Sequence, residues 1–302
     1  MRTARAAASD FAGLEATLAE RRRRVEACLA RLLPHGQAPL VEAAMRDSLQ
    51  APAKRLRPIL ALLVTEVLRG DPDAVLPAAC SVELVHTASL ILDDLPSMDD
   101  AAARRGRPAC HLAHGEANAI LAAFALLSRA FEILAEGWPG GPDAGVRALI
   151  GRELSRAVGP EGMVAGQAED LAMTDRAVDF PTLEFIHSRK TGALFTAAAA
   201  LGALGAEASA SEKAAVVAYA KNVGLAFQIV DDIIDATLGA AEAGKDVGQD
   251  AKKTTFVSFA GVAGARQLAR ELVDTGQRAL AGFGPQAQPL LDLAEYVVAR
   301  RR

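Results

Sequence analysis

Few aromatic side chains and few cysteines occur in this chain: aromatics make up 4% of its 302 residues, and there are three cysteines. Cys28, Cys80 and Cys110 are odd in number and lie far apart, which favours neither a disulfide framework nor a zinc site. A reducing compartment such as the cytoplasm is therefore expected. The formal net charge of −4 argues against binding to nucleic acid, because such binding draws on an excess of positive charge.

Long apolar runs without charge are also missing. We find no stretch of about twenty such residues, so no membrane span is expected. The basic start of the chain is not followed by the apolar segment that a secretory signal needs, and residues of about 1–10 are expected to form a flexible tail. Internal repeats and low-complexity linkers are absent as well, which favours a single domain over residues 1–302.

Helical patterns fill the sequence instead. Apolar residues recur three and four apart over 14–32, and the run Arg21–Arg24 inside this segment is expected to lie on a solvated face. Proline and glycine separate further segments of the same kind. No convincing alternating strand is found, so the sequence predicts an all-α bundle of ten or more helices. The further helices are expected at about 58–70, 76–94, 117–137, 144–171, 181–205, 209–236, 252–276 and 286–300.

A first acidic cluster, DDLPSMDD, follows an apolar helical segment. Pro96 should end the helix, because its ring clashes with the preceding turn and it offers no amide hydrogen. Asp93 is then expected on the last helical turn, with Asp99 and Asp100 on the loop that follows. Carboxylates gathered in this way repel each other unless positive charge lies between them.

A second acidic cluster, FQIVDDIID, lies about 140 residues downstream. Asp231 and Asp235 are four residues apart, which places them on one face of a helix. The residues before and between are apolar, so these carboxylates project from a helix that is otherwise core. Two such clusters facing each other would suit magnesium, which takes one or two carboxylates together with waters and phosphate oxygens.

Short basic motifs surround the two clusters, and they indicate groups that hold phosphate charge. No glycine-rich phosphate loop of the common types occurs, so the usual nucleotide folds are excluded. The motifs are AKRLRP with Lys54, Arg55 and Arg57; ARRGRP with Arg104, Arg105 and Arg107; HSRKTGALF with Lys190 and Thr191; and GKDVGQDAKKTT with Lys245, Lys252 and Lys253.

Taken together, these segments resemble the trans-isoprenyl diphosphate synthases, the polyprenyl synthetase family, from about Lys54 to the C-terminus. The first acidic motif with its arginines, the segment GMVAGQAEDL, the pair Lys190-Thr191 and the second acidic motif follow in the family's order. One departure is Ala51-Pro52-Ala53 before Lys54, where the family usually has two glycines. The resemblance implies helices around a central active-site cavity and a homodimer.

The resemblance also implies roles for matching residues. Magnesium ions bridged to an allylic diphosphate would be held by Asp93, Asp99, Asp231 and Asp235, with less direct support from Asp94, Asp100 and Asp232. The allylic diphosphate would be gripped by Arg104, Lys190, Lys245 and one of Lys252 and Lys253. Isopentenyl diphosphate would be bound by Lys54, Arg57, His86 and Arg105, although His86 could instead be a core histidine. The reacting carbons would be lined by Gln167, Thr191 and Gln228.

The length of the product depends, in this family, on the residues four and five before the first aspartate. Here they are Ser89 and Ala88, and neither is the bulky aromatic that blocks growth in short-chain members. The segment around the first motif is most similar to bacterial geranylgeranyl diphosphate synthases of carotenoid and photosynthetic-pigment pathways, which implies a twenty-carbon product. A farnesyl diphosphate synthase and a non-catalytic partner subunit remain the alternatives, whereas a helical metal-carboxylate oxidase lacks its Glu-x-x-His pairs.

Overall fold

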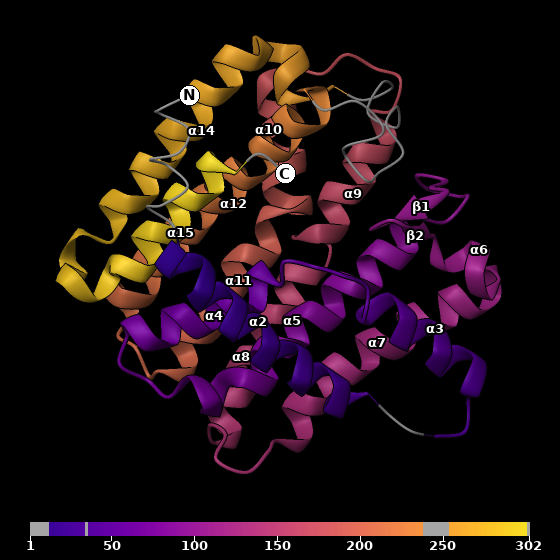
Figure 1. Ribbon diagram of the computed structural model, residues 1–302, viewed down its shortest axis with the longest axis horizontal. Coiled ribbons are helices and arrows are strands. Elements are labelled where there is room, and N and C mark those ends of the chain that lie inside the picture. The colour runs from indigo at the N-terminus through magenta and orange to yellow at the C-terminus, as the bar shows by residue number, and fades with distance from the viewer. Residues whose placement is uncertain (1–11, 34–35, 238–253, 301–302) are drawn as a thin grey trace.

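The computed structural model describes residues 12–33, 36–237 and 254–300, and these are almost entirely helical (Figure 1). More than ten α-helices occur in this part of the chain, which confirms the all-α class. The expected flexible tail lies outside the described residues. The helices are α2 (Ala12–Leu32), α3 (Pro39–Leu49), α4 (Leu56–Val67), α5 (Pro72–Asp93), α6 (Cys110–His114), α7 (Glu116–Glu136), α8 (Ala144–Val158), α9 (Met163–Ala172), α10 (Phe180–Lys190), α11 (Gly192–Gly205), α12 (Ala210–Thr237), α14 (Phe256–Ala279), the 3-10 helix η2 (Ala281–Ala287) and α15 (Gln288–Ala299).

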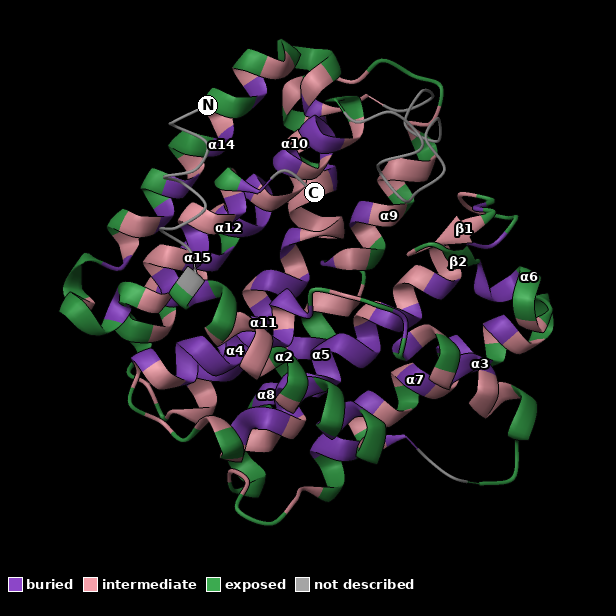
Figure 2. Ribbon diagram, in the orientation of Figure 1, coloured by how far each residue is buried: buried purple, intermediate pink, exposed green. Residues whose placement is uncertain are grey.

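The centre of the core is formed by α4, α5 and α11, whose ribbons are largely buried in Figure 2. Small residues let α11 approach α4 closely. A β-carbon at Gly202 would lie 2.4 Å from the carbonyl oxygen of Ala61, so only glycine fits this contact. The Thr65 hydroxyl donates to the Gly202 carbonyl oxygen at 3.2 Å across the same contact. These contacts bring the helix that follows Lys190 against the helix that carries Arg57.

The long helix α5 begins and ends where its sequence dictates. Asp71 precedes it, and its carboxylate accepts a hydrogen bond from the Asp73 amide at 2.9 Å, while Pro72 occupies the first helical position, where no amide hydrogen is needed. The helix ends at Asp93, three residues before Pro96, as expected. The sequence predicted a start near Leu76, which is one turn too late, because the capping residue Asp71 lies before the apolar pattern begins.

Three helices from the C-terminal part of the chain, α12, α14 and α15, pack against one another (Figure 1). The hydroxyl of the buried Tyr219 on α12 donates to the Leu290 carbonyl oxygen on α15. Gly276 of α14 lies against α12, where an added β-carbon would be 3.3 Å from the Tyr219 carbonyl oxygen. This packing fixes α12, and with it the second acidic cluster, on one side of α11.

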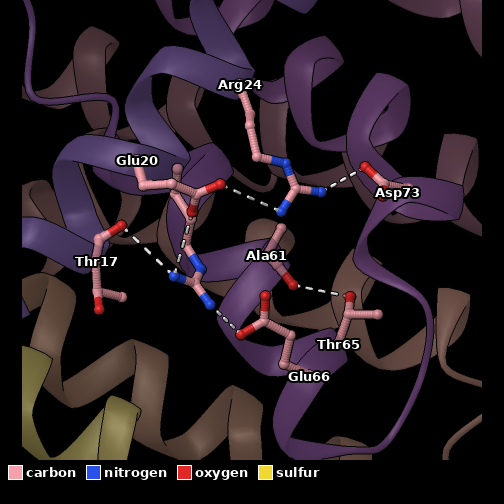
Figure 3. Close-up of polar contacts among 8 residues, drawn as sticks. Thr17, Glu20, Arg24, Ala61, Thr65, Glu66 and Asp73 are labelled. Carbon is pink, nitrogen blue, oxygen red and sulfur yellow. Dashed lines mark hydrogen bonds and ion pairs between the residues drawn. The ribbon is translucent and has the colours of Figure 1, made fainter.

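The N-terminal helix α2 is tied to the core by two of its four consecutive arginines. Arg21 forms an ion pair with Glu66 of α4, and Arg24 forms one with Asp73 of α5 (Figure 3). The expectation that the whole run lies on a solvated face was therefore wrong for these two residues, while Arg22 and Arg23 are exposed as expected. Such partly exposed pairs stabilise a fold by about 0–1 kcal/mol each.

Several local elements differ from the sequence expectations. A two-stranded antiparallel hairpin, β1 (Ala103–Arg104) and β2 (Arg107–Pro108), is present where no strand was expected. Arg105 and Gly106 both have positive φ angles, as the tight turns of two-residue hairpins require. The short helices α3 and α6 were missed, because each has too few turns to show a clear period. The predicted helices 144–171 and 181–205 are each divided into two.

Two helices are long and apolar enough to cross a membrane by length and composition alone. The apolar window of α5 is 72% buried inside the protein, as expected of a core helix. The window of α7 is only 39% buried, and Leu121 and Phe124 on this helix are exposed. Of these two helices, only α7 therefore has an apolar face that the rest of the described chain leaves uncovered.

Candidate functional site

The loop after α5 folds back over the end of the helix. The Asp99 amide donates to the Asp93 carbonyl oxygen at 2.9 Å, and the Asp100 amide donates to the Leu95 carbonyl oxygen at 3.1 Å. Asp100 has a positive φ angle of 47° and an exposed side chain. Asp99 thus lies on the loop after the helix, as the sequence predicts, with its amide bonded to Asp93, and Asp100 is left toward solvent.

Asp93 lies among charges of both signs. The pKa of its carboxyl is raised to about 6: burial is the largest cause and the carboxylates of Asp99 and Asp94 add to it, whereas the Lys190 ammonium and the Arg104 guanidinium partly oppose it. A carboxyl in this state favours an added positive charge, because burial and like charge both oppose its ionised form. Within the described chain, no three His, Cys, Asp or Glu side chains gather closely enough to form a metal site by themselves.

Asp94 is turned away from this cluster toward the hairpin. It is buried, with 2% exposure, and it accepts a hydrogen bond of 2.9 Å from Nε of Arg104, which also contacts it through Nη2. Burial would lower the pKa of Arg104, but the Asp94 hydrogen bond and the charges of the three neighbouring aspartates outweigh it and raise the pKa. Asp94 therefore fixes the hairpin through Arg104, and the same contact holds Arg104 beside Asp93.

Lys190, at the end of α10, completes the positive side of the first cluster. Its ammonium lies 2.7 Å from the Asp170 carboxylate of α9. The two helices touch at Gly166, where an added β-carbon would lie 2.3 Å from the Lys190 amide nitrogen. Next along α9, the Gln167 amide reaches Met98 in the aspartate loop, with its nitrogen 3.9 Å from the sulfur. The α9 segment thus holds Lys190 and meets the aspartate loop at the same time.

A second group, of two arginines and a histidine, lies beside the first cluster, on α4, α5 and the hairpin. The pKa of Arg57 is lowered to about 10: burial is the largest cause and the Arg105 charge adds to it, while Glu83 and Asp231 partly oppose both effects. Burial also holds the pKa of His86 well below its usual value, with Arg57 and Arg105 as the next largest causes. These residues are close enough for each charge to act on the others, so three of the four residues assigned to isopentenyl diphosphate come together.

The fourth of these residues, Lys54, is exposed and precedes a buried arginine. Arg55 has 3% exposure, forms an ion pair of 2.6 Å with Glu83 and donates to the Ala51 carbonyl oxygen at 3.2 Å. This pair shapes the loop in which the family's two glycines are replaced. The sequence motif predicted that Arg55 binds phosphate, but its guanidinium is paired with Glu83.

The second acidic cluster faces the C-terminal end of the described chain. Arg300 lies 2.9 Å from the Asp231 carboxylate, and its guanidinium stacks over the Phe227 ring at 3.9 Å. It also donates to the Phe227 carbonyl oxygen at 2.7 Å. Sequence reasoning missed Arg300, since a lone arginine at a helix end carries no distinctive spacing. Asp235, one turn along α12, is half-buried.

Asp232 has a structural position inside the protein. It is buried, accepts from the Gln228 amide at 3.0 Å and accepts from the Phe256 backbone amide, at the start of α14, at 3.0 Å. Gln228 in turn accepts from the Thr191 hydroxyl at 2.9 Å. This chain of hydrogen bonds ties Thr191 to α12 and α14. Because Thr191 follows Lys190, the same loop lies between the first and second acidic clusters.

Aromatic side chains lie beneath the charged groups. The Phe195 and Phe227 rings are 5.5 Å apart, with the guanidinium of Arg57 over the first ring at 4.8 Å and that of Arg300 over the second. Such faces attract cations. Two of the arginines near the acidic clusters are thus stacked on an apolar aromatic pair.

The residues expected to control product length lie on α5 below Asp93. Ala88 is buried, with 4% exposure, and Ser89 is half-buried, its hydroxyl donating to the His86 carbonyl oxygen at 2.9 Å. Neither side chain is large. Lys245, Lys252 and Lys253, the remaining candidates for the allylic diphosphate, lie outside the described residues.

Comparison with known proteins gives a consistent picture. Residues 38–277 match the family model described as polyprenyl synthetase. The chain is 40% identical over 286 residues to a geranylgeranyl diphosphate synthase of Cyanophora paradoxa, covering 94% of this chain and 95% of that one. It is 42% identical over 286 residues to a dimethylallyltranstransferase of Fischerella ambigua, covering 94% of this chain and 82% of that one. A crystal structure of an apo FPP/GFPP synthase from Zymomonas mobilis aligns with a TM-score of 0.84 at 36% identity, covering 95% of this chain and 99% of that one.

Proposed function

The chain belongs to the polyprenyl synthetase family, and from that premise we propose that it is a magnesium-dependent trans-prenyltransferase. It condenses isopentenyl diphosphate with allylic diphosphates to form geranylgeranyl diphosphate. The names of relatives, such as the geranylgeranyl diphosphate synthase that is 40% identical over most of its length, support this substrate class and product.

One observation carries the proposal: two adjacent sets of charges differ in composition. The first set joins Asp93 and Asp99 to Lys190 and Arg104, and it suits a diphosphate whose charge is shared with divalent cations. The second set, Arg57, His86 and Arg105, is positive and suits a diphosphate bound without metal. A reaction between two diphosphate esters needs both kinds of site side by side.

Magnesium fits the first set by its donor chemistry. Burial first, and then like charge, raise the pKa of Asp93. A bound divalent cation would lower that pKa again, because it favours the ionised carboxylate. A cage of three protein carboxylates is not required, because magnesium in phosphate sites usually keeps waters and phosphate oxygens among its ligands. Asp93 and Asp99 would hold magnesium on one side, and Asp231 and Asp235 on the other. When bound, the metal supplies charge that stabilises the diphosphate as it leaves.

The side chains of the protein then have distinct tasks. Lys190 and Arg104 bind the diphosphate of the allylic substrate, and their attraction grows as that group departs with its full charge. Arg57 and Arg105 orient isopentenyl diphosphate so that its double bond faces the allylic carbon. Phe195 and Phe227 form an apolar surface that helps to exclude water from the reacting carbons. Loss of a proton to the released diphosphate completes the new double bond.

The amide and hydroxyl groups between the two acidic clusters are assigned to positioning. Thr191 and Gln228 share a hydrogen bond of 2.9 Å, and Gln167 lies near the aspartate loop. We assign these three side chains to the lining of the reacting carbons. Asp94 and Asp232 support the site indirectly, because their carboxylates are engaged by Arg104 and by the start of α14.

A twenty-carbon product is proposed from the residues below Asp93. Ala88 and Ser89 are small, so neither would stop a growing chain at fifteen carbons. The corresponding alternative is a farnesyl diphosphate synthase, and the similar protein from Zymomonas mobilis is named an FPP/GFPP synthase. Product length therefore forms the decisive readout.

A homodimer is proposed for the working enzyme. The outer face of α7 exposes Phe124 at 65% and Leu121 at 53%, and an apolar face of this kind favours burial against another protein surface. A second copy of this chain is the partner that the family implies, and covering α7 in this way accounts for its hydropathy without a membrane span. We further propose a single domain and a cytoplasmic location, the latter supported by three free cysteines.

The test is a product assay with the purified protein. Labelled isopentenyl diphosphate would be supplied with dimethylallyl, geranyl or farnesyl diphosphate, with magnesium or with excess chelator, and the products sized. The expected result is magnesium-dependent formation of twenty-carbon diphosphate from each primer. A fifteen-carbon product alone would assign the farnesyl alternative. No turnover by a folded, magnesium-loaded protein would assign the non-catalytic subunit.

A further inference from the structure

A cavity of about 230 Å³ lies beside the two diphosphate sets, between α3, the C-terminal half of α5, the hairpin β1–β2 and α6. In Figure 1 these elements lie on the side of the view opposite α14. Thr87, Leu90, Ile91 and Asp94 line it, following the three- and four-residue spacing of one helix face. That face is turned about 100° from the one that carries Asp93, since successive helical residues differ by this angle.

One of the residues that line this cavity carries a buried hydroxyl without a hydrogen-bond partner in the described chain. Thr87 is 2% exposed, and its Oγ1 atom has no hydrogen-bond partner among the described residues. A buried threonine on a helix usually donates to the carbonyl oxygen one turn earlier, as Thr65 does to Ala61 at 2.9 Å. A buried hydroxyl without a partner costs free energy, so the cavity favours a ligand with an acceptor atom at this point.

The charges around the cavity leave an excess of cations. Arg104 is paired with Asp94, and His114 lies 2.9 Å from Asp47. Two further arginines line the cavity, Arg105 and Arg107. Neither of them forms an ion pair with a carboxylate of residues 12–33, 36–237 or 254–300, so both guanidinium groups remain for an anionic ligand.

The rest of the lining is apolar, with Ile91, Pro108 and Cys110 among its members. The volume is below the roughly 300–1,000 Å³ of sites for drug-sized ligands, so the occupant is small. A hydroxyl donor and two guanidinium groups favour a phosphate, because guanidinium forks bind phosphate oxygens in pairs. The apolar wall favours a short hydrocarbon group attached to it.

We propose that this cavity is a second binding site for a small organic phosphate, held by Thr87, Arg105 and Arg107 and distinct from the diphosphate sites. The Asp94–Arg104 pair stays intact when the site fills, because removing Arg104 would leave the buried Asp94 carboxylate without its partner. The ligand instead draws Arg105 toward the cavity. If Arg105 also binds isopentenyl diphosphate, as the proposed function holds, occupancy weakens that substrate's binding.

The binding test uses 3-methylbutyl phosphate in calorimetric titrations, with the diphosphate sites saturated by magnesium and inorganic pyrophosphate. We expect one equivalent to bind, several-fold more weakly than without pyrophosphate, because both ligands draw on Arg105 and the coupling is reciprocal. Thr87→Val removes the hydroxyl at nearly constant volume and should weaken binding about 10- to 100-fold, the range for a hydrogen bond to a charged group. Ala113→Phe should abolish binding by filling the cavity mouth. Thr65→Val, an equally buried threonine outside the cavity, should leave the affinity unchanged.

Three results would overturn the proposal. They are complete displacement of the ligand by pyrophosphate, unchanged affinity in both cavity variants, and equal or tighter binding of inorganic phosphate or of 3-methylbutanoate. A separate kinetic measurement tests the link to Arg105. In the wild type the ligand should raise the KM for isopentenyl diphosphate several-fold with kcat unchanged, and Ala113→Phe should remove this effect. Binding without the kinetic effect would refute the link to Arg105 while leaving the second site in place.

Discussion

Asp231 and Arg300 form an ion pair of 2.9 Å in which the arginine is almost completely buried and the aspartate is about one-quarter exposed. The guanidinium is also stacked on Phe227 and bonded to its carbonyl oxygen. The residue that directly follows α15 therefore neutralises one of the carboxylates assigned to magnesium. In this arrangement the protein supplies an internal cation to the second acidic cluster.

Replacing Arg300 tests that arrangement. Arg300→Ala should lower the free energy of unfolding by about 1–3 kcal/mol, since it removes a stacked and hydrogen-bonded cation but leaves Asp231 partly hydrated. Urea unfolding would measure the change. Arg300→Lys keeps the charge but loses the planar stacking, so an intermediate loss is expected. Equal stability of all three proteins would show that the pair contributes nothing.

The Lys190–Asp170 pair should matter for the reaction more than for stability. Asp170→Asn removes the charge that holds the lysine ammonium at 2.7 Å and should reduce kcat/KM for the allylic substrate about 10- to 100-fold. Steady-state kinetics would measure this loss. The double variant Asp170→Asn with Lys190→Met should be no worse than Lys190→Met alone. An additive loss in the double variant would contradict a role that acts through Lys190.

Enlarging the residue below the first acidic cluster should shorten the product. Ala88→Phe places a bulky ring beneath Asp93, and products of fifteen carbons or fewer are expected by chromatography. Because Ala88 is 4% exposed, overpacking should also cost about 1–3 kcal/mol of stability. A matched Ser89→Phe variant tests the neighbouring position. Twenty-carbon products from both folded variants would place the growing chain elsewhere.

Acid should destabilise the protein through His86. Burial, followed by the charges of Arg57 and Arg105, holds the pKa of this imidazole well below 6.5. Above about pH 6.5 the group is neutral in both folded and unfolded chains and contributes no pH dependence. Below it the unfolded chain takes up the proton first, so the free energy of unfolding falls by up to about 1.4 kcal/mol per pH unit.

His86→Gln should reduce that slope between about pH 5 and 6.5, as measured by urea unfolding across the range. His114→Gln, which removes a histidine outside the basic cluster around Arg57, serves as the comparison. A slope that is the same in His86→Gln as in the wild type would mean that other groups cause the acid sensitivity.

Magnesium and pyrophosphate should stabilise the fold jointly. A ligand present at about 100 times its dissociation constant adds about 2.7 kcal/mol to the free energy of unfolding, which corresponds to a rise in Tm of roughly 5 °C or more. Thermal unfolding with both present should show this rise, and each alone should show much less. The Asp93→Asn variant should lose most of the joint effect. Equal shifts with pyrophosphate alone would argue that the basic residues bind it without metal.

The long helices could be predicted from the sequence because each repeats its apolar residues over several turns. The end of α5 at Asp93 and the position of Asp99 on the loop that follows were both predicted from Pro96. The hairpin could not be predicted from alternation, because each strand has two residues. Its signal was the pair Arg105-Gly106, which the turn holds at positive φ.

Contacts between distant segments were beyond the sequence patterns. Nothing near Arg55 shows that it pairs with Glu83 rather than with a ligand, and nothing near Asp232 shows that it accepts from the start of α14. Both residues stand in motifs beside groups that do face the site. A motif specifies which residue types are present, whereas burial and distant partners decide which of them are left to bind a substrate.

The contact at Gly166 links two of the assigned groups mechanically. With no side chain there, α9 and α10 meet backbone to backbone beside Lys190. Any larger residue at position 166 would have to push the end of α10 outward, because its β-carbon would lie 2.3 Å from the Lys190 amide nitrogen. The spacing between Lys190 and Gln167 therefore depends on a residue that itself carries no functional group.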